Sequence, residues 1–137
     1  MIKIAVVQDS PKYLDLNGTL RKIKILMQEA ADKGCQLIAF PETFIPGYPY
    51  WVWLEAPYLG QKLFPVLYRN SVRIPGPAVT ELSRMAQHFR LVTVIGVNEV
   101  EPDSSGTIYT RICSSTRTAL IKTKSCFACS ADSATLP

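Results

Sequence analysis

This 137-residue chain has no long apolar run, a single histidine and no large excess of either charge sign. No apolar stretch approaches the roughly 20 residues that a membrane-spanning helix needs, so no membrane association is expected. Residues 1–7 run directly into Gln8 and Asp9 without a signal-peptide cleavage site, and a cytoplasmic location is therefore expected. Lysine and arginine outnumber aspartate and glutamate by only 15 to 11 and form no basic stripe, which argues against a nucleic-acid partner.

Metal ligands are also too few to form a recognisable metal site. Cys126 and Cys129 have a C-x-x-C spacing, but the sequence offers no second such pair, and His88 has no ligand four residues later. No metal and no cofactor are therefore expected, and the cysteines are expected to be free thiols. Cys35 precedes an apolar run and should pack as a small hydrophobic residue. Cys113 lies in no recognisable nucleophile motif.

Apolar periodicity predicts alternating strands and helices over about the first hundred residues. Asp15 or Asn17 can cap the first helix, and Gly34 can end it. The order of elements predicts an α/β fold with a parallel part to its sheet. The expected elements are a strand at 2–7, a helix to about Lys33, a strand at 37–40, a partly helical stretch at 54–68 interrupted by Pro57 and Pro65, a helix at 78–89 and a strand at 91–97.

The segment Gly34–Pro49 carries the most specific information in the chain. Its apolar run ends at Pro41, which lacks the N–H that a strand needs, and a carboxylate, Glu42, follows at once. A stiff turn at residues 46–49 comes next. A carboxylate at the mouth of a buried strand is expected in partly desolvated surroundings, which suit it to general-base chemistry. A lone glutamate at a strand end is more often a surface group. The whole pattern of residues 34–49 is therefore needed to distinguish a catalytic base from a surface carboxylate.

That pattern resembles the first signature of the nitrilase, or carbon–nitrogen hydrolase, family at Gly34, Phe40, Glu42, Ile45 and residues 47–49. The resemblance covers residues 1–109 and implies the N-terminal half of an αββα sandwich. It also implies a hydrolase that acts on a nitrile or an amide with three groups. These are a glutamate as general base, a cysteine as nucleophile and a lysine that stabilises the tetrahedral intermediate.

Only Glu42 carries over from that set of three groups. Lys122 and Lys124 lie near the expected lysine position, but not in the basic segment that the family shows. None of the cysteines lies in a family-like nucleophile strand. We therefore expect the chain to be inactive alone. A second interpretation is a non-catalytic fragment that acts as an interaction module with intact nitrilase subunits.

The aromatic run at residues 48–54 favours the true nitrilase branch of the family. Tyr48, Trp51 and Trp53 are candidates for a substrate pocket or for the interface of a homo-oligomer. The sequence leaves open the substrate and the choice between nitrilase, cyanide hydratase and amidase activity.

Composition changes near Thr110, where serine and threonine become frequent. This change predicts a family domain at residues 1–109 and a poorly ordered tail at 110–137. A one-base deletion at codon 110 would turn the Asn-Thr-strand-Asp-Gly pattern of the family into the residues found at 110–119. We interpret the tail as an out-of-frame translation of a truncated family member, with a second change or divergence beyond Leu120 left open. Resequencing the locus tests this hypothesis.

Overall fold

The structure is a computed structural model that describes residues 1–54, 56–101, 106–115 and 122–129, without the side chains of residues 59 and 122–129. The described strands form one sheet in the order β1-β2-β3-β4-β5. Strands β1, β2 and β3 are parallel, whereas β4 and β5 are antiparallel to their neighbours. The α/β class expected from the sequence is confirmed. The elements are β1 (Ile4–Val6), α1 (Leu16–Asp32), β2 (Leu37–Ala39), α2 (Trp51–Leu54), α3 (Pro57–Asn70), α4 (Pro77–Phe89), β3 (Val92–Val100), β4 (Ile108–Ser115) and β5 (Lys122–Cys129).

Helix α1 begins and ends with the residues that its sequence indicates. The Asp15 side chain accepts a hydrogen bond from the Gly18 N–H at 2.8 Å, which satisfies one of the free donors of the first turn. Gly34 follows the last turn at a φ of +72°, a conformation that costs glycine little. Asp15, rather than Asn17, is therefore the N-cap.

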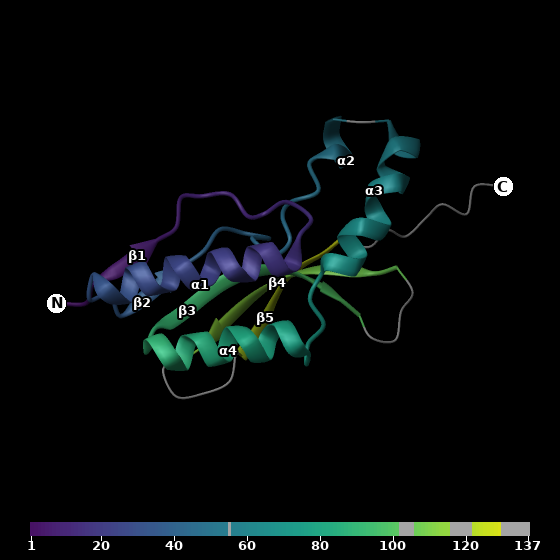
Figure 1. Ribbon diagram of the computed structural model, residues 1–137. Helices are drawn as coiled ribbons and strands as arrows, with labels where there is room; N and C mark the ends of the chain where they lie inside the picture. Colours follow the sequence, from purple (N-terminus) through teal and green to yellow (C-terminus); the bar gives the residue numbers. More distant parts are fainter. Residues whose placement is uncertain (55, 102–105, 116–121, 130–137) are drawn as a thin grey trace.

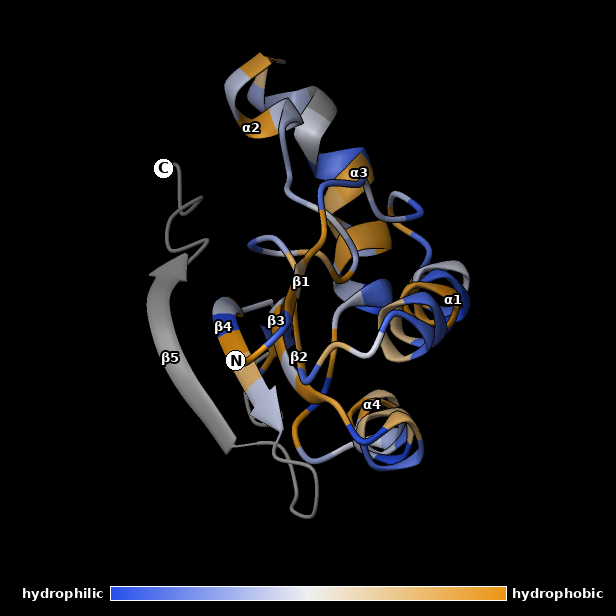
Figure 2. Ribbon diagram, turned by 90° about the vertical axis from the view of Figure 1, so that its left-hand side faces the viewer, coloured by the Kyte–Doolittle hydropathy of each residue, from blue (hydrophilic) through white to orange (hydrophobic). Residues whose placement is uncertain are grey.

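Helices α1 and α4 lie side by side against one face of the sheet (Figures 1 and 2). Their apolar side chains pack with the sheet residues that point toward them, and together they form the main core. Ile38, Ile95 and Cys113, from β2, β3 and β4, are each at most 1 % exposed. The core also contains Ile23, Met27, Leu82, Met85 and Ala86 from the two helices.

The opposite face of the sheet is apolar and open. Side chains alternate between the two faces of a strand, so the residues next to the buried ones point away from the helices. Ile4 and Val6 on β1 are 55 % and 72 % exposed, and Ile112 on β4 is 37 % exposed. In register with Ile4 and Val6 across the sheet, Leu37, Ala39, Val92 and Val94 are half-buried. We call these seven residues the open face.

Helices α2 and α3 project from one end of the sheet (Figure 1). The sequence predicts that Pro57 and Pro65 interrupt this stretch. For Pro57 the expectation holds, since α2 ends at Leu54 and α3 begins at Pro57, and for Pro65 it is wrong. Pro57 occupies the first turn of α3, where a missing N–H costs nothing, and Pro65 lies inside the helix. Pro65 is exposed, and the helix continues past it to Asn70. None of the described helices is both long and apolar enough to cross a lipid bilayer.

Residues 110–115 correct a second expectation. The sequence predicts weak packing from Thr110 onward, but Thr110–Ser115 completes β4, which pairs with β3 from Val100↔Ile108 to Thr93↔Ser115. Cys113 is fully buried in the core. Alternation of polar and apolar residues suffices to seat a half-buried strand, even where serine and threonine are frequent. Residues 116–121 and 130–137 lie outside the described residues.

Candidate active site

Glu42 lies on a short excursion from the sheet at the C-terminal end of β2. The Phe40 N–H donates to the Val94 carbonyl at 2.8 Å, and the Ile45 N–H donates to the Gly96 carbonyl at 3.3 Å. Between these attachments, residues 41–44 leave the plane of the sheet. The prediction that Glu42 follows the C-terminal end of the second strand is confirmed. Loops at this edge of parallel strands are where α/β proteins gather their functional groups.

The excursion forms one wall of a hollow of about 380 Å³. The Glu42 side chain itself is exposed, so the partly desolvated setting expected from the sequence is absent from the described structure. The described walls surround this carboxylate on too few sides to exclude water. The hollow is lined by Asp9, Ser10, Pro11, Tyr13, Pro41, Glu42, Thr43, Phe44, Gly47, Tyr48 and Tyr50.

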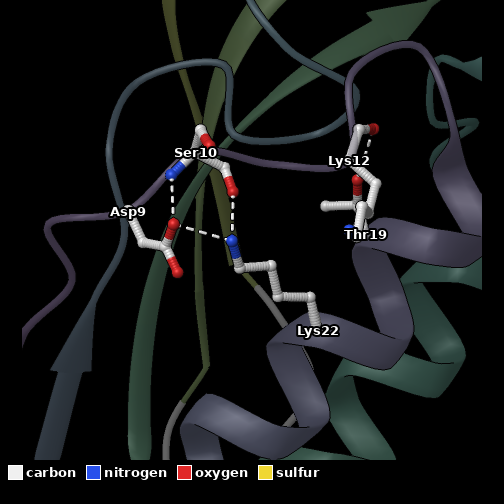
Figure 3. Close-up of polar contacts among 5 residues, drawn as sticks. All are labelled: Asp9, Ser10, Lys12, Thr19 and Lys22. Atoms are coloured by element: carbon white, nitrogen blue, oxygen red, sulfur yellow. Dashed lines mark hydrogen bonds and ion pairs between the residues drawn. The ribbon is translucent and has the colours of Figure 1, made fainter.

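Asp9, the second carboxylate of the hollow, is held by Lys22 of α1 (Figure 3). The Lys22 ammonium lies 2.7 Å from Asp9 Oδ1 and donates to the Ser10 carbonyl at 2.6 Å. The hydrogen bond from Lys22 lowers the pKa of Asp9, helped by the Ser10 N–H. Asp9 is therefore engaged in a structural pair. No described side chain forms an ion pair with Glu42, which leaves its carboxylate available for chemistry.

Tyr13 connects residues 41–48, which we call the Glu42 loop, to the segment after β1. Its hydroxyl donates to the Tyr48 carbonyl at 3.1 Å. Gly47 lies so close that a Cβ there would be 2.7 Å from the Tyr13 ring, and Gly47 has a φ of +121°. Desolvation raises the pKa of Tyr13, so its hydroxyl remains a hydrogen-bond donor. The hollow is thus built from two segments that lie far apart in the sequence.

The three aromatic candidates have different positions. Tyr48 lines the hollow and is half-buried. Trp51 is 6 % exposed and packs in a second cluster with Leu67 of α3. Its ring contacts the Tyr13 ring edge-on, but Trp51 does not itself line the hollow. Trp53 is 76 % exposed on α2, and its indole N–H donates to the Tyr48 hydroxyl at 3.0 Å. Tyr48 is therefore the aromatic candidate that this geometry favours for substrate contact.

The cysteines contribute nothing to the hollow in the described part of the chain. Cys35 packs at the margin of the main core, as the sequence predicts. Burial raises the pKa of Cys113 to about 11, which keeps its thiol protonated. Cys126 and Cys129 lie on β5, as do Lys122 and Lys124, and the side chains of that strand lie outside the description.

Sequence reasoning missed several residues of the hollow. Asp9 and Ser10 follow the first parallel strand and so reach the same sheet edge as Glu42, which is a signal that the sequence contains. Tyr13 and Thr43 carry no such signal. Thr43 is 2 % exposed, and its hydroxyl has no hydrogen-bond partner in the described structure. It lies beside Glu42 at a φ of +47°.

Fold and site together define an α/β protein with a loop-borne carboxylate at the carboxyl ends of parallel strands. Residues 3–124 match the model of the carbon-nitrogen hydrolase family. The chain belongs to this family. The match extends past Thr110, near which the sequence predicts a domain edge.

Curated relatives and solved structures agree with this assignment. The chain is 52 % identical over 81 residues to a nitrilase of Bacillus sp. (strain OxB-1), covering 59 % of this chain and 24 % of that protein. It is 41 % identical over 98 residues to an aliphatic nitrilase of Rhodococcus rhodochrous, covering 71 % of this chain and 27 % of that protein. The chain thus spans about a quarter of the length of these relatives.

Two solved structures show the same fold. A CN-hydrolase superfamily protein of Xanthomonas campestris superimposes with a TM-score of 0.66 at 17 % identity, over 90 % of this chain and 40 % of that one. An amidase of Nesterenkonia sp. gives a TM-score of 0.62 at 17 % identity, over 90 % of this chain and 42 % of that one.

Proposed function

We propose that this chain carries the general base of a nitrilase, an enzyme that hydrolyses a nitrile to a carboxylic acid and ammonia. The observation that carries the proposal is the position of Glu42 at the carboxyl ends of the parallel strands, where it borders the hollow and forms no ion pair with a described side chain. The names of the relatives, a nitrilase and an aliphatic nitrilase, support a nitrile as the substrate. Tyr48 and Tyr50 line the same hollow and provide apolar surface for the organic part of the substrate.

In the proposed reaction, Glu42 acts as a general base twice, first toward the thiol and last toward a water molecule. It removes the proton from a thiol as the sulfur attacks the nitrile carbon, and that proton passes to the nitrile nitrogen, which gives a covalent thioimidate. Water then converts the thioimidate to a thioester with loss of ammonia. A second water, activated by the same carboxylate, releases the acid and regenerates the thiol.

We propose that the chain alone does not turn over substrate. Of its four cysteines, Cys35 and Cys113 pack in or against the core and away from Glu42. Groups that act as a unit lose nearly all catalysis when one member is removed. A base without its nucleophile and its stabilising cation should therefore give no measurable rate.

An ammonia-release assay on aliphatic and aromatic nitriles tests both statements. The purified chain should release no ammonia above the buffer background. Substituting Glu42→Gln in a catalytically competent protein that contains this segment should abolish turnover, whereas Asp9→Asn at the paired carboxylate should retain most of it. Turnover by the chain alone, sensitive to Glu42→Gln, would show that a cysteine of this chain is the nucleophile. Full activity of the Glu42→Gln protein would remove Glu42 as the base.

A second candidate is an interaction module that associates with intact nitrilase subunits. The open face favours it, because sheet residues such as Ile4 and Val6 leave apolar surface uncovered. Co-purification of the chain with a full-length nitrilase from the same source tests this candidate. A chain that never co-purifies, even at high concentration, would exclude it.

A further inference from the structure

Gly96 of β3 lies directly opposite the excursion that carries Glu42. A Cβ at Gly96 would be 2.5 Å from the Thr43 nitrogen, 2.7 Å from Glu42 Cα and 2.9 Å from the Glu42 carbonyl carbon. All three are backbone atoms, so no rotamer change can make room. The positive-φ glycines are Gly34, Gly47 and Gly106, and Gly96 is not among them. The proximity of Glu42, and not the local strand conformation, is therefore what excludes a side chain at position 96.

Asn98, two residues further along β3, holds the other end of the loop. Its side chain is 3 % exposed and donates from Nδ2 to the Gly47 carbonyl at 3.1 Å. Its backbone N–H donates to the Ile45 carbonyl at 2.7 Å. A buried amide is costly unless it is hydrogen-bonded, and the described partner of this one is the Glu42 loop. Gly96 and Asn98 thus contact the loop before and after the turn.

We propose that Gly96 and Asn98 are positioning residues for Glu42. The absent side chain at Gly96 lets the Glu42 backbone approach β3, and the Asn98 amide fixes the return of the loop at Gly47. This inference rests on the proposed function of Glu42, since its placement matters to chemistry only if it acts as the base. A base displaced by about 1 Å loses much of its rate advantage. Position 96 therefore determines where the carboxylate stands.

Nuclear magnetic resonance of the isotope-labelled chain tests the proposal without requiring turnover. The variants are Gly96→Ala, which adds the excluded Cβ, and Asn98→Asp, which removes the amide donor at nearly constant size. The matched control is Ile95→Val, which trims a core residue on the opposite face of the same strand. The readouts are the carboxyl resonance of Glu42 with its pH profile, the amide exchange rates of Ile45 and Gly47, and the melting temperature.

Both test variants should displace the Glu42 resonance and speed exchange at Ile45 and Gly47 by about tenfold, because hydrogen bonds of the loop are weakened. The Phe40 amide, bonded to Val94 ahead of the excursion, should keep its rate. Ile95→Val should lower the melting temperature and leave the Glu42 resonance in place.

The proposal is overturned if Asn98→Asp leaves Glu42 and the loop amides unchanged, or if Ile95→Val moves them equally. Should Gly96→Ala fail to fold, Asn98→Asp decides alone. The readouts concern geometry, so they are independent of nitrile hydrolysis. Displaced resonances together with a fully active Glu42→Gln enzyme would contradict the proposed function while leaving the positioning intact. Unchanged resonances together with an inactive Glu42→Gln enzyme would contradict the positioning and leave the proposed function intact.

Discussion

The thiol of Cys113 points from β4 into the main core, where no solvent reaches it. Desolvation raises its pKa from 9.0 to about 11, although the nearby Arg111 charge acts in the opposite direction. Well below pH 9 the thiol is protonated in both the folded and the unfolded chain. Between pH 9 and pH 11 the unfolded chain ionises first, so the free energy of unfolding falls as the pH rises through this range.

This loss can be measured by urea unfolding at several pH values. By pH 10 the thiol should account for a loss of about 1 kcal/mol, since each unit of pKa shift corresponds to about 1.36 kcal/mol. Tyrosines and lysines titrate in the same range, so Cys113→Ala is the reference. Its stability starts lower because of the cavity but should decline less steeply with pH. Parallel curves for the two proteins would contradict the assignment.

Individual residues differ in how far the sequence alone could place them. Glu42 follows an apolar run and a proline, and both signals are local, so its position at the strand end was predictable. Its exposure was not, because that depends on which distant segments surround it. Tyr13 illustrates the limit: its contact with Gly47 joins residues more than thirty positions apart, and neither residue signals the other.

Among the elements, α1 offers a direct test of how capping contributes to stability. Asp15→Ala removes the acceptor for the Gly18 N–H and should lower the free energy of unfolding by about 1 kcal/mol. The matched control is Asn17→Ala, because Asn17 is exposed and was the alternative cap in the sequence. That substitution should change stability by less than about 0.5 kcal/mol. Chemical denaturation of both variants checks the prediction, and equal losses would refute the assignment of the cap.

Elements with a strong local signal were predictable, and elements that depend on tertiary packing were less so. The apolar periodicity of α1 and α4 gives their bounds within a residue or two. Helix α3 contains Pro65, and a local rule cannot show that the helix continues past it. The end of β4 was missed for a related reason. Its sequence alternates but contains serine and threonine, a composition that suggests a poorly ordered segment. The strand is ordered because it pairs with β3, a distant segment of the chain.

At the scale of the molecule, the open face should drive association. It presents Ile4, Val6 and neighbouring apolar side chains without a charged residue among the seven that define it. A sheet covered on one side only tends to bury its other apolar side. The chain should therefore self-associate with rising concentration in sedimentation velocity experiments.

Two substitutions to lysine separate this face from the rest of the surface. Val6→Lys places a charge on β1, the edge strand of the open face, where Val6 is 72 % exposed, and should shift the chain toward monomer. Ile25→Lys alters an equally apolar residue, 60 % exposed on α1, and should leave association unchanged. A chain that is monomeric at every concentration, or an equal effect of both substitutions, would show that the open face is not the contact surface.

The strands stand in the sheet in the order in which they occur in the chain. During synthesis, each strand after β1 can therefore pair with the preceding strand, which has already left the ribosome. No strand has to be inserted between two others that have already paired. Since domains begin to fold from the N-terminal side as they are made, this sheet can be assembled by addition at one edge. The segment that carries Glu42 can then form its hydrogen bonds with Gly96 and Asn98 only after β3 has been synthesised.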